Sequence, residues 1–317
     1  MLVAMTLLAL TACTWVKDDN DDCLYGFWLN LHYTYNILDV EAAPRYLKGA
    51  YVYVYGTDGQ FVKRIDVQQA ALTAEGFRVR VDDLPEGDYQ FVVWSGIANS
   101  QYALAGDMQP MDEFRLLLTA PGAVVTQQLG DVFYGYLHTV HYDSSYASHD
   151  VSMIKDTNQL ACLLVSVDGE ELTPDDYTMT LTATNGVLNG YNAIVADEAT
   201  VYEPFVAEES IIDDPDYGTL YGAKFGISTL RLLSDGDSRI TLMRKSTQEP
   251  VLSIMLPEYI GMIGSLYTNL GQPLTLQEYL DRQDFYTIVF YIAAETNQLI
   301  QLKVNNWRLR ASNHLKL

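Results

Sequence analysis

Three cysteines are the residues of this chain best suited to covalent chemistry, because a thiolate is a nucleophile and a metal ligand. They stand at positions 13, 23 and 162. Cys13 follows an uncharged run, MLVAMTLLALTA. That run is too short to span a bilayer, which takes about 20 apolar residues, but it fits the apolar core of a secretory signal, usually about 7–15 residues long. We therefore predict a signal peptide at residues 1–12. No basic residue precedes the run, so we expect the true start to lie upstream.

The end of the run, Leu10-Thr11-Ala12-Cys13, resembles the lipobox of bacterial lipoproteins. Such a motif has a branched apolar residue, two small residues that let the peptidase approach, and then the cysteine. The thiol takes a diacylglycerol, and the amino group freed by cleavage can be acylated. Several acyl chains, at about 0.8 kcal/mol per buried methylene group, make a stable anchor. We predict lipidation at Cys13; an ordinary signal peptide with a chance cysteine is the alternative.

A charged stretch follows the predicted lipidation site. It resembles the short Lys-then-acidic tag that sends Bacteroidales lipoproteins to the outer leaflet, with Lys17, Asp18, Asp19, Asp21 and Asp22 as its charged residues. The alternative is a solvated, flexible tether, which an acidic composition favours in any case. Under both interpretations residues 13–23 are a lipidated acidic tether.

The other two cysteines leave two possibilities open. Cys23 and Cys162 could form a disulfide in an exported protein. Cys162, in QLACLLVSV, also has the surroundings of a small buried hydrophobic residue. We favour two separate thiols, because the sequence does not place them within bonding distance.

Few other residues suggest a reactive or metal-binding site. His138 and His141 are three apart in a strand-like segment, so they should face opposite sides. The acidic clusters at 213–216 and 235–237 lack the spacing of an EF-hand loop, and a solvated loop is the simpler interpretation. Common nucleophile, nucleotide and zinc motifs are missing. Trp94 and Trp307 could stack on a sugar, but a core position is more usual for such tryptophans. We predict no catalytic, cofactor or metal site and no enzyme.

The composition of the chain limits the kinds of partner that it can bind. Lys and Arg number 19 against 41 Asp and Glu, which gives a net charge of −22. Binding to nucleic acid depends on basic contacts to phosphate, so this balance argues against it. The sequence shows no second apolar segment long enough to span a membrane, and attachment would depend on the lipid.

The rest of the chain has the pattern of an all-β protein. The chain contains 23 Tyr, and aromatic residues suit half-buried strands. Apolar residues alternate along 27–35, 50–67, 77–96, 114–129 and 131–142, with turn signals at Thr57-Asp58-Gly59, Pro85-Glu86-Gly87 and Pro121-Gly122. Similar segments cover 151–167, 177–189, 220–233, 238–246, 250–257 and 285–310, the last with a turn at Thr296-Asn297. We expect an acidic loop at 208–218, a helix at 275–283 capped by Thr275, and a short helix within 67–76.

This pattern predicts two tandem β-sandwiches with one or two short helices. A polar stretch at 143–150 marks the expected boundary, so we assign 24–148 to an N-terminal sandwich and 149–317 to a C-terminal one.

An ordered set of segments resembles the FimB-type fimbrial anchor subunit family of Bacteroidales. The segments are the lipobox, DDCLYGFWLNLHYTYN, VYVYGTDGQFV, LPEGDYQFVVWSG, DVFYG, IKDTNQL, QEYLDRQDFYTIVFYI and VNNWRL. The family often has proline where this chain has Leu24. The resemblance implies two transthyretin-like sandwiches in a lipid-anchored, cell-surface protein of the outer membrane. It would hold the base of a fimbrium, bind the stalk subunits, and take part in assembly and length control.

Relatives that polymerise lend a strand to a neighbour's sheet, in which main-chain hydrogen bonds give affinity. We expect strand addition to involve the first strand, around Phe27–Tyr35, or the segment QLKVNNWRL at 301–309. The competing hypothesis is a surface lipoprotein that binds glycans, which would need exposed aromatic side chains.

Overall fold

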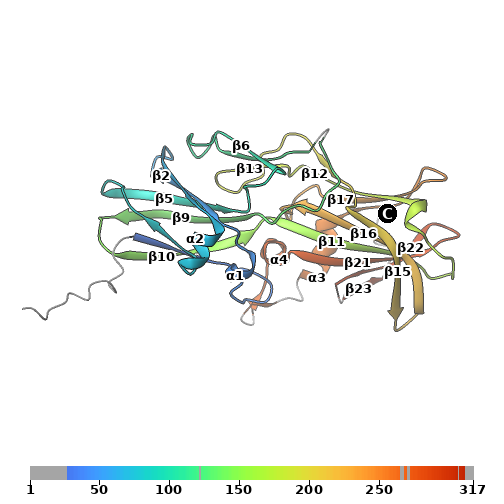
Figure 1. Ribbon diagram of the computed structural model, residues 1–317. Helices are drawn as coiled ribbons and strands as arrows, with labels where there is room; N and C mark the ends of the chain where they lie inside the picture. The colour runs from blue at the N-terminus through green and yellow to red at the C-terminus, as the bar shows by residue number, and fades with distance from the viewer. Residues whose placement is uncertain (1–26, 121–122, 265–267, 270–271, 306, 311–317) are drawn as a thin grey trace, which may run out of the picture.

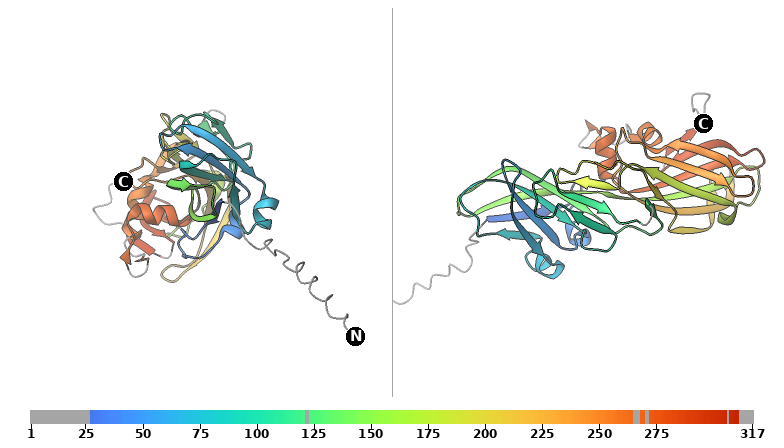
Figure 2. Two further views of the ribbon diagram at one scale, coloured as in Figure 1. Left: turned by 90° about the vertical axis from the view of Figure 1, so that its left-hand side faces the viewer. Right: turned by 90° about the horizontal axis from the view of Figure 1, so that it is seen from above.

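The computed structural model describes residues 27–120, 123–264, 268–269, 272–305 and 307–310. Two β-sandwiches lie end to end in an elongated molecule (Figures 1 and 2). This confirms the predicted all-β class. Among the described residues, no helix has the length and apolar character needed to cross a membrane.

The first sandwich is built from one seven-stranded sheet that folds over on itself. Its order is β3-β2-β5-β9-β10-β1-β4. The sheet bends over at β10, because Ala147–Ser152 of this strand pair with β1 and Met153–Lys155 pair with β9. The strands are β1 (Phe27–His32), β2 (Ala50–Gly56), β3 (Phe61–Val67), β4 (Arg78–Val81), β5 (Gly87–Ser95), β9 (Phe133–Tyr142) and β10 (Ala147–Lys155).

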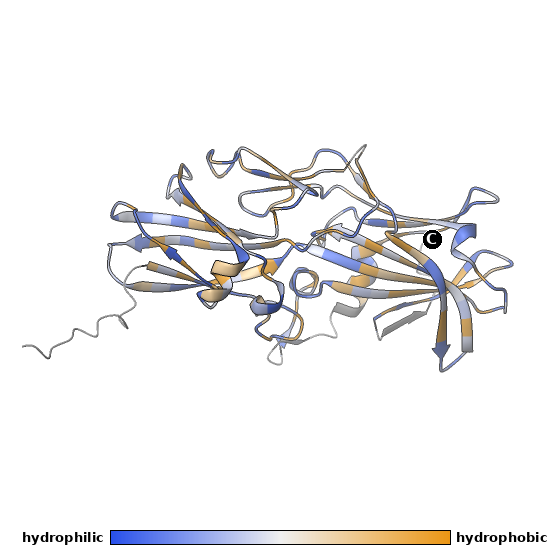
Figure 3. Ribbon diagram, viewed as in Figure 1, coloured by the Kyte–Doolittle hydropathy of each residue, from blue (hydrophilic) through white to orange (hydrophobic). Residues whose placement is uncertain are grey.

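Side chains alternate between the two faces of these strands and so contribute to two separate cores. Val52 and Val54 face the core inside the sandwich, whereas Tyr53 and Tyr55 face the opposite side of the sheet. A small three-stranded sheet, β13-β7-β6, adds apolar cover to that outer side. Its strands are β6 (Tyr102–Ala105), β7 (Arg115–Leu118) and β13 (Val187–Asn189). Side chains on both faces of β2 and β5 are therefore buried. Figure 3 shows how hydrophobic and hydrophilic residues are distributed along the strands of both sandwiches.

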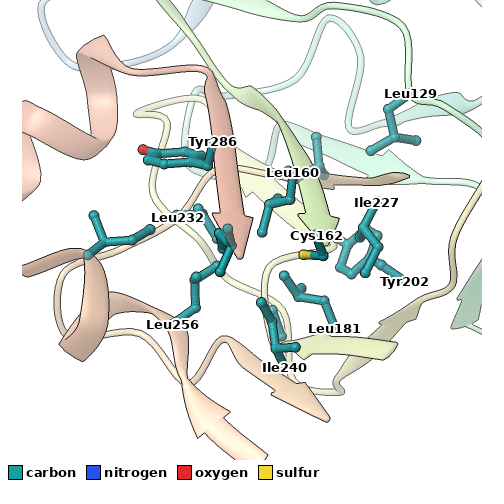
Figure 4. Packing of buried hydrophobic residues seen from close by; sticks show 14 of the residues in the cluster. Leu129, Leu160, Cys162, Leu181, Tyr202, Ile227, Leu232, Ile240, Leu256 and Tyr286 are labelled. Carbon is teal, nitrogen blue, oxygen red and sulfur yellow. The ribbon is translucent and has the colours of Figure 1, made fainter. Parts of the chain in front are cut away.

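The second sandwich has a six-stranded sheet opposite a five-stranded one, ordered β15-β16-β11-β21-β22-β23 and β18-β17-β12-β14-β8. The first contains β11 (Thr157–Ser166), β15 (Val206–Asp214), β16 (Gly218–Leu230), β21 (Phe285–Ala293), β22 (Gln298–Val304) and β23 (Trp307–Arg310). The second contains β8 (Val124–Val125), β12 (Tyr177–Ala183), β14 (Thr200–Tyr202), β17 (Arg239–Arg244) and β18 (Glu249–Met255). Figure 4 shows the core between them, in which Cys162 packs among Leu160, Leu181 and Ile240.

Short helices and one further hairpin complete the chain. The helices are α1 (Ala43–Tyr46), α2 (Gln69–Ala74), α3 (Leu256–Gly264), α4 (Leu276–Arg282) and the 3₁₀ helix η3 (Pro174–Asp176), and the hairpin is β19 (Thr268–Asn269) with β20 (Gln272–Pro273). α2 and α4 are the two helices expected from sequence. Thr275 caps α4, because its hydroxyl accepts from the Glu278 N–H and the Glu278 carboxylate accepts from the Thr275 N–H.

The two sandwiches exchange short segments. β13 comes from the second half of the sequence and pairs with β7 of the first, and β8 comes from the first half and pairs with β14 of the second. The chain passes from one sandwich to the other at Asp156, between β10 and β11. The boundary expected after residue 148 thus lies within β10, a strand of the first sandwich.

Three sequence expectations differ from the structure. The acidic stretch 208–218, expected as a loop, forms most of β15 and the turn into β16, because its backbone pairs with β16 from Val206 to Asp214. The segment 151–167 is two strands in different sheets. The final segment has three strands, because the chain turns again after Val304.

Candidate functional site

The residues predicted to carry the lipid and the export signal lie outside the described residues. They are Cys13, Lys17, Asp18, Asp19, Asp21 and Asp22. Cys23 also lies outside them. Cys162 is a buried free thiol, and burial raises its pKa to about 12. A cysteine in that state is a packing residue and not a nucleophile at neutral pH.

The first strand is internal to its sheet. β1 pairs with β10 in parallel and with β4 in antiparallel fashion. Both edges of β1 are therefore occupied, and a partner strand could not add beside it without displacing one of these neighbours. Tyr33 lies just beyond β1 and is also buried.

The six-stranded sheet offers two edges for strand addition. In the described residues no further strand pairs with β15 on one side or with β23 on the other. β23 belongs to the segment 301–309 that sequence had singled out. β15 was missed, because its acidic residues had indicated a loop; the signal available was the β-branched pair Ile211-Ile212 within it.

An apolar cross-strand pair marks the β15 edge. Ile211 lies opposite Tyr221 of β16, and their exposed fractions are 64% and 51%. On the opposite face of the same hairpin, Lys224 Nζ and Glu208 Oε1 form an ion pair of 2.7 Å. Exposed apolar side chains on an edge strand are unusual, since natural edges are commonly protected by charge.

The acidic residues of this hairpin have structural partners. Asp214 accepts hydrogen bonds from the Asp216 and Tyr217 N–H groups and from the Tyr291 hydroxyl, and Asp213 accepts from Thr219. These bonds form the turn into β16. Among the described residues, no group of His, Cys, Asp and Glu has an arrangement suited to a metal ion.

The histidines on β9 are both exposed at one end of the first sandwich. His141 Nδ1 lies 2.8 Å from Asp88 Oδ1, and the ring of His138 stacks on Tyr136. The left-handed backbone of Thr139, at φ 42°, interrupts the alternation between them. The expectation of opposite faces therefore fails, since regular alternation does not hold across this irregularity.

Polar side chains connect the two sandwiches around the end of α4. We call this set the junction: Asp39, Asp131, Lys155, Asp156, Asn192, Arg231, Asp281, Arg282 and Asp284. The Ile37 N–H donates to the Arg282 carbonyl at 2.9 Å, and Arg282 pairs with Asp39. The Arg282 guanidinium also lies 4.1 Å from the ring centroid of Tyr35. A loop of the first sandwich is thereby fixed to a helix of the second.

Lys155 makes a second connection at the end of β10. Its Nζ lies 2.9 Å from Asp131 Oδ1 and 2.7 Å from Asp284 Oδ2. Burial opposes the charged ammonium, but the carboxylates of Asp284 and Asp131 outweigh it, and the pKa of Lys155 is raised. Lys155 is therefore a permanent cation that binds a loop of the first sandwich to the start of β21.

Arg231 makes a third connection, just after β16. Its Nε and Nη2 each lie 3.0 Å from an oxygen of Asp281 on α4, a bidentate pair. Its Nη1 donates to the Asn192 carbonyl at 2.8 Å. Asn192 follows β13, which pairs with β7, and the Tyr134 hydroxyl of β9 donates to the carbonyl of Gly190 in the same segment, so this bond reaches the first sandwich. Buried polar groups that are hydrogen-bonded to one another in this way fix one arrangement of the parts they join.

A hollow of about 290 Å³ is lined by Arg45, Tyr46, Lys48 and Asp131 among others. Trp28 and Trp94 are buried. Trp15 and the side chain of Trp307 lie outside the description. A sugar platform built on Trp28 or Trp94 is therefore excluded.

Comparison with known proteins gives one family and several shared folds. The model of the fimbrillin-A associated anchor proteins Mfa1 and Mfa2 matches residues 20–313. A search of curated proteins finds no match. Among solved structures, a proposed polysaccharide-binding protein of Bacteroides thetaiotaomicron is 24% identical, with a TM-score of 0.79, covering 92% of this chain and 99% of its own.

Two further structures have the same fold. A proposed adhesin of Bacteroides thetaiotaomicron is 22% identical, with a TM-score of 0.80, and covers 90% of this chain and 97% of its own. The fimbrial anchor protein Mfa2 of Porphyromonas gingivalis is 16% identical, with a TM-score of 0.68, and covers 90% and 99%. At these identities the likeness establishes the fold, and the family model assigns the family: the chain belongs to the fimbrillin-A associated anchor proteins.

Proposed function

We propose that the protein is a cell-surface lipoprotein that anchors a fimbrium to the outer membrane. Acylated Cys13 would hold it in the outer leaflet, with residues 13–23 as the tether. The two sandwiches, assigned from sequence to 24–148 and 149–317, would form a stiff body that receives the fimbrial stalk subunits. The observation that carries this proposal is the match of the anchor family over residues 20–313.

The family favours a structural role for the protein. The junction supports the same view, because it ties the sandwiches together at three places and so resists bending. A body at the base of a fibre has to transmit force from the fibre to the membrane. A rigid joint does this without loss of contact between its parts.

We further propose that stalk subunits dock by strand addition on the six-stranded sheet, and that this contact takes part in assembly and length control. The support is geometric: β15 and β23 have no second strand partner in the described part of the chain, whereas β1 has two. An incoming strand would extend the sheet by main-chain hydrogen bonds. The exposed pair Ile211 and Tyr221 would supply the first side-chain contacts on the β15 edge.

Loss of the acylated sulfur tests the anchoring proposal. In cells that make Cys13→Ala, palmitate labelling of the protein should disappear and fimbriae should be found in the medium. Cys23→Ala is the matched control, since it removes a nearby cysteine outside the lipobox and should keep both labelling and attachment. Labelling that persists in Cys13→Ala would refute lipidation at this residue; fimbriae that stay on the cells without label would refute anchoring through the lipid.

Glycan binding is the alternative function that the sequence left open. The burial of Trp28 and Trp94 removes two of the four tryptophans that could have supported it.

A further inference from the structure

Asp156 occupies a singular place in the junction. It is the single residue between β10 and β11, where the chain leaves one sandwich and enters the other. Its exposed fraction is 0%. Its N–H donates to the Val132 carbonyl at 2.8 Å, so the backbone is fixed there. A carboxyl group at this position is shielded from bulk solvent.

The hydrogen bonds around Asp156 lack one donor when its carboxyl group is ionised. Asn192 Nδ2 donates to Asp156 Oδ1 at 2.9 Å. The other oxygen of each side chain, Asp156 Oδ2 and Asn192 Oδ1, is buried without a partner. An ionised carboxylate and an amide oxygen only accept, so neither can satisfy the other. A proton on Asp156 Oδ2 would turn this oxygen into a hydrogen-bond donor, next to the Asn192 amide that already donates to Asp156 Oδ1. Such a proton supplies the missing donor, and buried polar groups are rarely left without a partner.

The charges around Asp156 are also unbalanced when its carboxyl group is ionised. Arg231 is the nearest cation, and its bidentate pair with Asp281 already matches its charge. Its Nε lies 3.9 Å from Asp156 Oδ1, beyond hydrogen-bond distance. With Asp156 ionised, this buried group of three would carry a net negative charge. With Asp156 protonated, the group is neutral, which avoids the large cost of an uncompensated buried charge.

The other elements packed near Asp156 supply no further cation. Tyr134 on β9 and Tyr102 on β6 face it with phenol groups, whose pKa values are raised by burial, so they stay neutral. Lys155 precedes Asp156 in the chain, but Asp131 and Asp284 bind its ammonium.

We propose that Asp156 and Asn192 form a proton-binding site, in which one proton on the Asp156 carboxyl group completes the junction between the two sandwiches. Loss of that proton leaves a buried, unpaired negative charge at the point where the chain crosses. The junction is therefore weaker in alkaline than in mildly acidic medium.

The direction and range of this effect follow from the titration of Asp156. Burial raises its pKa from 3.8 to about 7, against the opposing effects of the Arg231 charge and the Asn192 hydrogen bond. A group whose pKa is raised on folding stabilises the folded state fully below its unfolded pKa, and this stability is lost as pH rises through the folded pKa. The loss should therefore extend over pH 4 to 7 and level off above that.

The test compares the full chain with Asp156→Asn across pH. An asparagine amide has the shape of the protonated carboxyl, accepts from Asn192 Nδ2 through its oxygen and donates through its nitrogen. Urea unfolding at pH 5, 6, 7 and 8 gives the unfolding equilibrium constant of each protein. The ratio of wild type to Asp156→Asn should rise roughly a hundredfold from pH 5 to pH 8. Asp197→Asn, at an exposed carboxylate, removes the same charge and should leave the ratio of wild type to variant constant.

A second measurement does not depend on comparative stability. Infrared spectra of the folded wild type should contain a protonated-carboxyl band that fades between pH 6 and pH 8 and is missing from Asp156→Asn. A constant stability ratio together with no such band would overturn the proposal. If Asp156→Asn fails to fold, the wild-type band alone decides, because its absence at pH 6 would show that Asp156 is ionised there.

Discussion

At the scale of single residues, the junction is made of charged and polar side chains whose partners are distant in sequence. Lipidation at Cys13 is a prediction that needs only its immediate neighbours, because a peptidase site is a local pattern. The state of Asp156 could not be predicted in this way, since the residues that define it, Asn192, Arg231 and Asp281, are 36 to 125 positions away. A sequence shows that an aspartate is present, but not that its carboxyl group is buried without a donor for one of its oxygens.

The value of a buried ion pair can be tested at Arg231. Arg231→Met should lower the free energy of unfolding by about 3–5 kcal/mol, because it leaves Asp281 buried without its cation. Arg80→Met is the control. Arg80 pairs with Asp82 at 3.4 Å with both side chains 54% exposed, so its loss should cost within about 0.5 kcal/mol. Urea titration measures both, and equal costs would show that the junction is not a special source of stability.

At the scale of elements, sequence patterns were reliable where the structure is local. The capping box at Thr275 and the turn at 57–59 are encoded within a few residues, and α4 and the β2–β3 hairpin form as expected. β15 was missed because its strand character comes from pairing with β16 and not from its own acidic composition. The switch of sheets at Asp156 was missed for the same reason, since the polar run at 155–159 does not by itself show which sheet each flanking strand joins.

The β15 edge gives an element-scale prediction. Ile211→Lys places a charge where we propose that a strand docks, so fewer fimbriae should be recovered with the anchor attached. The free energy of unfolding should change by no more than about 0.5 kcal/mol, because Ile211 is mostly exposed. Leu38→Lys is the matched control, since Leu38 is 74% exposed on a loop away from that edge. Pull-down of fimbriae with each variant is the measurement, and equal recovery would exclude β15 as the docking edge.

At the scale of the whole molecule, the sandwich architecture followed from alternating strands, but the exchange of β8 and β13 between the sandwiches did not. Short strands of two or three residues have no pattern of their own. Their effect is to interlock the two halves, which together with the junction makes one long body. Such a body suits a protein whose two ends serve different attachments.

The most direct test of the account is the position of this protein on isolated fimbriae. Immunogold labelling in the electron microscope, with an antibody against the folded chain, should place gold at one end of each fibre and not along its length. In cells that make Cys13→Ala, the fibres released into the medium should carry the same terminal label. Label spread along the shaft, or fibres that carry none, would contradict an anchor at the base.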